Sequence, residues 1–331
     1  MRFFVIVTTL LLLGTASQAQ DIPRRPVATY SIVARDSLTG QLGVAVQSHW
    51  FSVGPIVPWV EPGVGAVATQ SLVDPAYGPL GLDLMRMGKT APQALKALII
   101  ADDNANIRQV AMVDAKGNVS AHTGDRAISA AGHQTGAQYS VQANLMAEET
   151  VWPAMAKAYE SSQGDLAERL LAALEAAENE GGDIRGKQSA AIIIVKAENT
   201  GRPWNDRLFD LRVEDHPNPV QELRRLVTLQ RAYLKLNEGD EWIGKGNIDK
   251  ALLAYQEATE IVPDAATNGE AAFWVGVTLA DTGKPEKAIP YLKRAYKQDK
   301  NWAKLIPRLS ASKLLPDEPG LISRLVTDMQ K

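Results

Sequence analysis

The sequence predicts an α+β fold in which antiparallel sheets are covered by helices, followed by a region made only of helices. Strand-like segments come in pairs separated by short turns, which is typical of hairpins. Helical stretches are grouped between these pairs and do not alternate with single strands. After residues 215–217 the strand pattern stops and only helical periodicity follows. This order argues against a parallel, doubly wound sheet, in which single strands and helices alternate.

The start of the chain is predicted to be a signal peptide and a short leader. Residues 1–19 combine a positive Arg2, an apolar run and small residues up to Ala19, the expected cleavage point. The run is short for a membrane-spanning helix, and a retained anchor is the alternative. Residues 20–27 are polar and proline-rich, as expected of a leader. We therefore expect a periplasmic or secreted protein with no membrane span after signal cleavage.

The amino-acid composition excludes several kinds of partner and site. The net charge of −3 and the lack of a basic stretch predict no nucleic-acid partner. The absence of cysteine excludes disulfides, cysteine–metal sites and a cysteine nucleophile. His122 and His133, with His49 or Asp125, match no common zinc spacing, so we predict no metal and no cofactor.

The elements of the sheet-containing part follow from turn residues and periodicity. Thr90 and Gln93 form a capping box that starts one helix. Residues 54–65 hold several glycine and proline breaks and are predicted to be a loop. Strands are predicted over 29–35, 41–47, 64–70, 108–114, 118–122, 139–142, 189–196 and 207–213, and helices over 80–88, 90–101, 145–160 and 164–180. We divide the chain into a sheet-containing domain over residues 28–227, the range over which it resembles a known family, and a helical domain over residues 228–331.

The helical domain contains an internal repeat. Ala251, Tyr255 and Ala258 recur 37 residues later as Ala288, Leu292 and Ala295. The pattern resembles tetratricopeptide repeats, although their usual period is about 34 residues; a generic helical hairpin is the alternative. The resemblance implies a concave surface that binds a protein or peptide partner.

Thr29 opens the first predicted strand and is the main candidate for catalysis. A β-branched residue is ordinary in a strand, so a purely structural role is one interpretation. If cleavage freed its amine, Thr29 would be a nucleophile carrying its own base. Ser31 and Ser48 are alternative nucleophiles, and His49 is a proton carrier or an ordinary loop histidine.

Two further groups of polar residues are candidates for substrate binding. In GGDIRGKQSA, Asp183, Arg185, Gln188 and Ser189 lead into a buried strand and would form a fork for a carboxylate or amide. A simple turn with an Asp183–Arg185 ion pair is the alternative. Asn144 is interpreted either as a helix N-cap or as a contact to substrate or oxyanion.

The chain resembles a known family over about residues 28–227. The stretches that carry the resemblance are YSIVARD, GQLGVAVQSHWFSVG, VPWVEPGVGAVATQ, GPLGLDLM, AGHQTGAQYSVQANLM, GDIRGKQSAA and DLRVEDHPNPVQELRRL. They resemble the domain-of-unknown-function 1028 family, which is grouped with N-terminal-nucleophile hydrolases. The resemblance implies a four-layer αββα sandwich with Thr29 as nucleophile and its own α-amine as base.

Two departures from that pattern bear on the mechanism. Residues 20–28 stand ahead of Thr29, so a cut between Ala28 and Thr29 is required to free the amine. Residues 57–66, where an assisting lysine is expected, contain none.

These observations favour an exported hydrolase that cleaves an amide bond in a peptide, a peptidoglycan fragment or a small amide. The alternative is a non-catalytic binding or assembly protein that holds a partner with its helical repeats. The hydrolase group often oligomerises, so the resemblance also allows a homo-oligomer.

Overall fold

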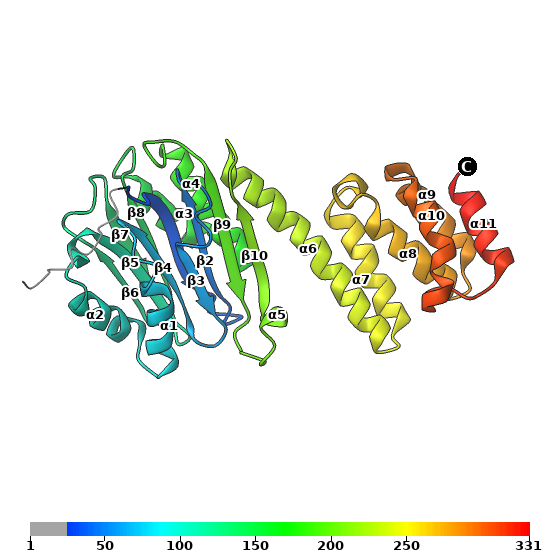
Figure 1. The fold of residues 1–331 in the computed structure, drawn as a ribbon, viewed down its shortest axis with the longest axis horizontal. Coiled ribbons are helices and arrows are strands. Elements are labelled where there is room, and N and C mark those ends of the chain that lie inside the picture. The colour runs from blue at the N-terminus through cyan, green and yellow to red at the C-terminus, as the bar shows by residue number, and fades with distance from the viewer. Residues whose placement is uncertain (1–24) are drawn as a thin grey trace, which may run out of the picture.

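The computed structural model describes residues 25–331, which form two stacked antiparallel sheets followed by a helical region (Figure 1). The predicted signal peptide and most of the predicted leader lie outside the described residues. The mixed fold with antiparallel sheets and a C-terminal helical region, predicted from the sequence, is confirmed.

The larger sheet has six strands in the order β10-β9-β2-β1-β8-β7. Its central pair is the predicted first hairpin, in which Thr29 faces Ser48 across the ladder. On its other side, β1 pairs with β8, which brings Asn144 opposite Thr29. The strands are β1 (Thr29–Arg35), β2 (Leu42–Ser48), β7 (Gly132–Gly136), β8 (Tyr139–Asn144), β9 (Ser189–Val195) and β10 (Arg207–Val213).

The smaller sheet has four strands in the order β3-β4-β5-β6 and faces the larger one. Its strands are β3 (Pro58–Glu61), β4 (Gly65–Ser71), β5 (Arg108–Asp114) and β6 (Val119–Thr123). Valine, isoleucine and alanine side chains from both sheets fill the space between them.

Helices cover the outer face of each sheet. The smaller sheet packs against α1 (Tyr77–Arg86) and α2 (Ala91–Ala101), and the predicted Thr90–Gln93 capping box at the start of α2 is confirmed. The larger sheet packs against α3 (Val151–Ser161) and α4 (Leu166–Asn179).

Alternation along β1 decides which side chains enter the space between the sheets. Tyr30 and Ile32 belong to the core under α3 and α4, whereas Val33 belongs to the core between the sheets. Because successive side chains of a strand point to opposite faces, Thr29 and Ser31 lie on the same side as Val33.

The C-terminal region is helical from Pro219 onward and begins with one long helix, α6. Its first half packs on the larger sheet through Val220, Leu223 and Val227, and its second half enters the helical core from Leu236 (Figure 1). The helices are α5 (Pro203–Asp206), α6 (Pro219–Gly244), α7 (Ile248–Ile261), α8 (Glu270–Asp281), α9 (Pro285–Gln298), α10 (Asn301–Leu305) and α11 (Pro319–Met329), and the short 3-10 turns are Ala105–Ile107, Asp264–Thr267, Ile306–Arg308 and Ser310–Ser312. Within residues 25–331, no helix has the length and apolar character needed to cross a bilayer.

The 37-residue spacing corresponds to a repeated contact between paired helices. A Cβ atom on Gly239 of α6 would lie 2.2 Å from the Tyr255 ring of α7. A Cβ atom on Gly276 of α8 would lie 2.6 Å from Leu292 of α9. Both glycines therefore allow a close approach of their helix to the next one.

The structure corrects three local predictions. The loop predicted over residues 54–65 contains β3, an edge strand that opens with Pro58, where a missing N–H is tolerated. The polar edge strand β7 was not predicted from its glycine-flanked sequence. The helix predicted from residue 145 begins at Val151, because Leu145 adopts a left-handed backbone with φ of 56°. Asn144 is consequently the last residue of β8 and does not cap a helix. The N-cap of α3 is Thr150.

Candidate active site around Thr29

Thr29 lies at the end of the sheet–sheet interface and has no exposed surface. Its Oγ1 donates a hydrogen bond to the Val27 carbonyl oxygen at 2.7 Å and lies 3.2 Å from Ser48 Oγ. The antiparallel register of β1 and β2 brings Ser48 to this position. Two hydroxyl groups therefore lie together beside the peptide bond that precedes Thr29.

The carbonyl oxygen of Ala28 accepts two hydrogen bonds from side chains. One comes from Ser48 Oγ, and the other comes from Arg185 Nη2 at 3.0 Å. This oxygen belongs to the Ala28–Thr29 peptide bond. Donors on a carbonyl oxygen polarise it and would stabilise negative charge that develops there during attack.

The Arg185 guanidinium is oriented by Asp183. Asp183 Oδ1 accepts from Arg185 Nε at 3.0 Å, and Oδ2 accepts from Arg185 Nη2 at 2.7 Å. The fully buried carboxylate also accepts from the backbone N–H groups of Arg185 and His49. Gly181 and Gly182 both have positive φ, which lets the chain turn sharply from α4 into this loop. The predicted Asp183–Arg185 pair therefore exists and contacts the residues ahead of Thr29.

Residues Arg25–Ala28, called here the pre-threonine segment, cover Thr29. Val27 forms an antiparallel bridge with Ser71 of β4, with N···O distances of 2.7 and 3.0 Å. Arg185 Nη1 donates to the Pro26 carbonyl oxygen at 3.3 Å, and the Arg25 guanidinium lies 4.7 Å from the centre of the Trp50 ring. Val27 and Ala28 are buried, so this segment closes the end of the interface.

A buried network of amide side chains, not predicted from the sequence, surrounds Thr29. Gln70 Nε2 donates to the Thr29 carbonyl oxygen at 3.1 Å and to Gln109 Oε1 at 2.7 Å. Asn144 Nδ2 donates to the same Gln109 oxygen at 2.9 Å. Gln142 Nε2 donates to Ser31 Oγ at 2.6 Å. Asn144 and Ser31 were predicted site residues, but no pattern in the sequence pointed to Gln70, Gln109 and Gln142, which each stand as one glutamine in a buried strand.

The predicted site residues separate into three groups. Ser48 and Arg185 contact the carbonyl oxygen of the Ala28–Thr29 bond, and Asp183 orients Arg185. Ser31 and Asn144 belong to the amide network; Asn144 Oδ1 is buried and has no hydrogen-bond partner within residues 25–331.

The other predicted site residues make their hydrogen bonds away from the Ala28–Thr29 peptide bond. Ser189 Oγ bonds to the backbone of Trp50 and Val53, and Gln188 is bonded to Asp215 near the surface. The backbone of His49 contacts Asp183, but its ring Nδ1 has no partner among the described residues.

A cavity of about 540 Å³ adjoins the amide network and is lined in part by Thr123, His133 and Trp152. Thr123 Oγ1 lies 2.8 Å from His133 Nδ1 and accepts from Gln109 Nε2 at 2.9 Å. Burial, followed by the charge of His122, lowers the pKa of His133 below its usual value. A neutral histidine at neutral pH therefore lies at the side of the cavity nearest the network.

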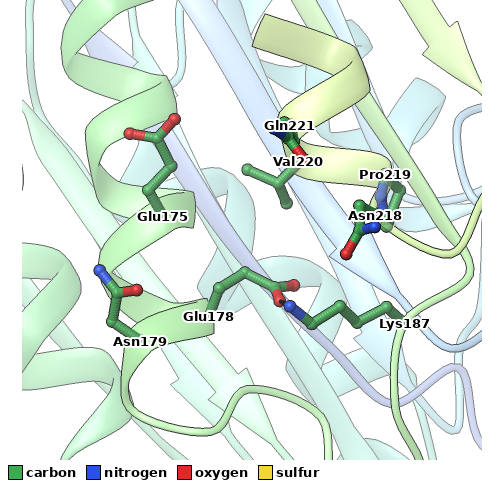
Figure 2. Close-up of a pocket in the computed structure, with 8 residues that line it drawn as sticks. All are labelled: Glu175, Glu178, Asn179, Lys187, Asn218, Pro219, Val220 and Gln221. Atoms are coloured by element: carbon green, nitrogen blue, oxygen red, sulfur yellow. Dashed lines mark ion pairs between the residues drawn. The ribbon is translucent and has the colours of Figure 1, made fainter.

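A second cavity, of about 170 Å³, lies on the opposite face of the larger sheet, between α4 and the start of α6. Figure 2 shows Lys187 and Glu178 meeting at an ion pair within it. The Tyr30 hydroxyl also donates to Glu178, and burial followed by the Glu178 charge raises the pKa of Tyr30. Because Tyr30 and Thr29 point to opposite faces of β1, this cavity is separated from Thr29 by the sheet.

Residues 25–331 contain no group of three or more histidine, aspartate or glutamate side chains arranged to hold a metal ion. The groups around Thr29 are hydroxyls, amides and one guanidinium–carboxylate pair. Such groups suit acyl transfer, in which an oxygen nucleophile attacks a polarised carbonyl.

Comparison with known proteins identifies the family of the chain. No curated protein matches it. A crystal structure of protein SPO2555 from Silicibacter pomeroyi is similar, with a TM-score of 0.54 and 30% sequence identity, over 60% of this chain and 84% of that one. The sequence pattern of DUF1028, described as a family of unknown function, matches residues 29–223, a range that begins at Thr29. The chain therefore belongs to the DUF1028 family.

Proposed function

We propose that the protein is an amide hydrolase of the N-terminal-nucleophile type that frees Thr29 by cutting its own Ala28–Thr29 bond. The observation that carries this proposal is the convergence of Ser48 Oγ and Arg185 Nη2 on the carbonyl oxygen of that bond, beside the Thr29 hydroxyl. The stack of two antiparallel sheets between two helix layers also supports the proposal, because a four-layer sandwich is expected of such hydrolases.

The proposed cut proceeds through an ester. Thr29 Oγ1 attacks the Ala28 carbonyl carbon, and the negative charge on the carbonyl oxygen is stabilised by Ser48 and Arg185. The C–O bond forms first and gives this oxyanion; the C–N bond then breaks, and the hydroxyl proton ends on the Thr29 nitrogen. Water then hydrolyses the ester, which gives a carboxylate on Ala28 and a free amine and hydroxyl on Thr29.

The freed amine supplies the base for later turnovers. The pKa of an unperturbed α-amine is about 8, closer to neutral than the value of about 10.4 for lysine, so an α-amine is the better base at neutral pH. This arrangement needs no lysine at residues 57–66. The substrates that fit are a peptide, a peptidoglycan fragment or a small amide.

Intact mass and N-terminal sequencing of the purified full-length protein test this proposal. We expect a chain that starts at Thr29, and an uncut Ala28–Thr29 bond in the Thr29→Ala variant. Thr29→Ser keeps a hydroxyl and should still be cut. Thr69→Ala is the matched control, because Thr69 is a buried strand threonine whose Oγ1 donates a hydrogen bond to the Asp74 carbonyl oxygen, away from the Ala28–Thr29 bond. A mature wild-type chain that retains residues 25–28 would contradict the mechanism.

A second candidate function is partner binding by the helical region. The repeated contacts of Gly239 with Tyr255 and of Gly276 with Leu292 support a tandem repeat of the tetratricopeptide kind, which presents a concave surface to a peptide or protein. Export to the periplasm or the medium, supported by the composition of residues 1–19, would place both activities outside the cytoplasm. Signal-peptide removal is checked in the uncut Thr29→Ala variant, whose exported chain should then start at Gln20.

A further inference from the structure

The pre-threonine segment is held as a bound peptide would be. Both backbone groups of Val27 pair with Ser71, the last residue of β4, which lies beyond the part of β4 that is paired with β3; an added strand pairs in the same way. Arg185 donates to two of its carbonyl oxygens, those of Pro26 and Ala28. These contacts involve the backbone of the segment, so they are available to any extended peptide.

The chemistry of the proposed cut connects this segment to the substrate. Attack by Thr29 produces an ester between its Oγ1 and the acyl group of Ala28. A peptide substrate cut after an alanine would produce the same ester on the same oxygen. The acyl part of the substrate and the pre-threonine segment must therefore occupy the same place when bound to Thr29.

We infer that the preferred substrates are extended peptides with a small residue immediately before the cleaved amide and a β-branched apolar residue before that. This inference rests on the proposed function. The segment shows which side chains the place accepts. Ala28 has no exposed surface, and Val27 is 1% exposed and packs in the core between the sheets.

The two positions farther from the cleaved bond accept a wider range of side chains. Pro26 is half-buried, and Arg25 is exposed above the Trp50 ring. A cation over an indole contributes only about 0.5–1 kcal/mol at an exposed site, so we expect a weak preference for a basic residue there. Selectivity should therefore lie in the two residues nearest the cut.

Fluorogenic peptides provide the test, using full-length protein whose N-terminus has been shown to be Thr29. The reference substrate is acetyl-Arg-Pro-Val-Ala linked as an amide to aminocoumarin. One altered substrate carries phenylalanine in place of the alanine, and another carries aspartate in place of the valine. We expect kcat/KM to fall by roughly 100-fold for each change, the scale by which a pocket rejects a poorly fitting group. The peptide acid acetyl-Arg-Pro-Val-Ala should inhibit competitively, and its phenylalanine analogue should not.

The outcomes separate the two proposals. Selective turnover together with selective inhibition supports the inference. Equal turnover of the alanine and phenylalanine substrates would overturn the inference and leave Thr29 as the nucleophile. A protein that keeps residues 25–28 and hydrolyses none of these amides would overturn the proposed function, and the inference with it.

Discussion

Arg185 is the residue whose loss should most affect the proposed cut while the proposed nucleophile, Thr29, stays in place. Its guanidinium contacts the carbonyl oxygens of Pro26 and Ala28 while Asp183 holds it in place. Arg185→Met keeps the length of the side chain and removes all its donors. We expect the appearance of the Thr29 N-terminus to slow by about 10²–10³-fold, the usual cost of losing one oxyanion donor. Time-resolved intact mass after synthesis of the full-length chain measures this rate.

Arg86→Met is the control for that variant. Arg86 also pairs with two carboxylates, those of Glu61 and Asp83, but it lies half-exposed on α1. Exposed ion pairs contribute little to stability, so this variant should cut at the wild-type rate. Equal slowing in both variants would mean that the effect of Arg185 is a general loss of folding.

Some residues of the site were predictable from the sequence and others were not. Thr29, Asp183 and Arg185 were identified because a strand start and a glycine-rich turn are local patterns. The contact between Arg185 and Ala28 joins positions 157 residues apart, and no local pattern encodes it. Gln70 and Gln109 were missed because a glutamine in a strand usually faces solvent, and only the stacking of the two sheets buries them.

At the level of elements, the paired helices depend on glycine where they approach most closely. A Cβ atom on Gly239 would overlap the Tyr255 ring, whereas a Cβ atom on Gly244, in the same helix, would meet nothing within 4 Å. We expect Gly239→Ala to lower the free energy of unfolding by about 1–3 kcal/mol through overpacking. Gly244→Ala should raise it by up to about 1 kcal/mol, because alanine favours helix. Urea denaturation followed by circular dichroism compares the stability of the two variants. Equal effects of the two substitutions would show that α6 and α7 do not approach closely at Gly239.

The strength of the local pattern explains which elements were predicted. The apolar strands β1, β2 and β9 and the capped helix α2 have strong local signals and were found within one or two residues. The edge strands β3 and β7 begin with a proline or a glycine and carry few β-branched residues, so their pairing depends on the neighbouring strand. The repeat spacing was visible, but the role of Gly239 required the position of Tyr255.

At the scale of the whole molecule, α6 connects two hydrophobic cores. Its first half is tied to α4 by ion pairs of Arg224 with Glu168 and Glu175, and its second half belongs to the helical region. The domain boundary predicted between residues 227 and 228 lies inside this continuous helix. The two regions therefore share an element, while the side chains of residues 25–331 that hydrogen-bond to the Ala28–Thr29 bond come from the sheet-containing region.

Because the helical region does not hydrogen-bond to this peptide bond within residues 25–331, we predict that a destabilising substitution in the helical core does not change the rate of the proposed cut. Leu292→Ala should lower the stability of the helical region by about 2–5 kcal/mol, because Leu292 is fully buried there. The rate at which Thr29 becomes the N-terminus should not change. Intact mass gives the rate, and thermal unfolding confirms the damage. A slower cut would show that the helical region takes part in the chemistry.

The Ala28–Thr29 bond is surrounded by groups from distant parts of the chain: Ser48 on β2, Ser71 on β4 through its bridge to Val27, and Arg185 after α4. Ser48 reaches the bond once β1 and β2 have paired, whereas Ser71 and Arg185 reach it only when the sheets have stacked and α4 has docked. Under the proposed chemistry, a misfolded or unfinished molecule would keep its nucleophile blocked. The proposed cut would then make activity depend on folding, since only a correctly folded molecule acquires hydrolytic activity.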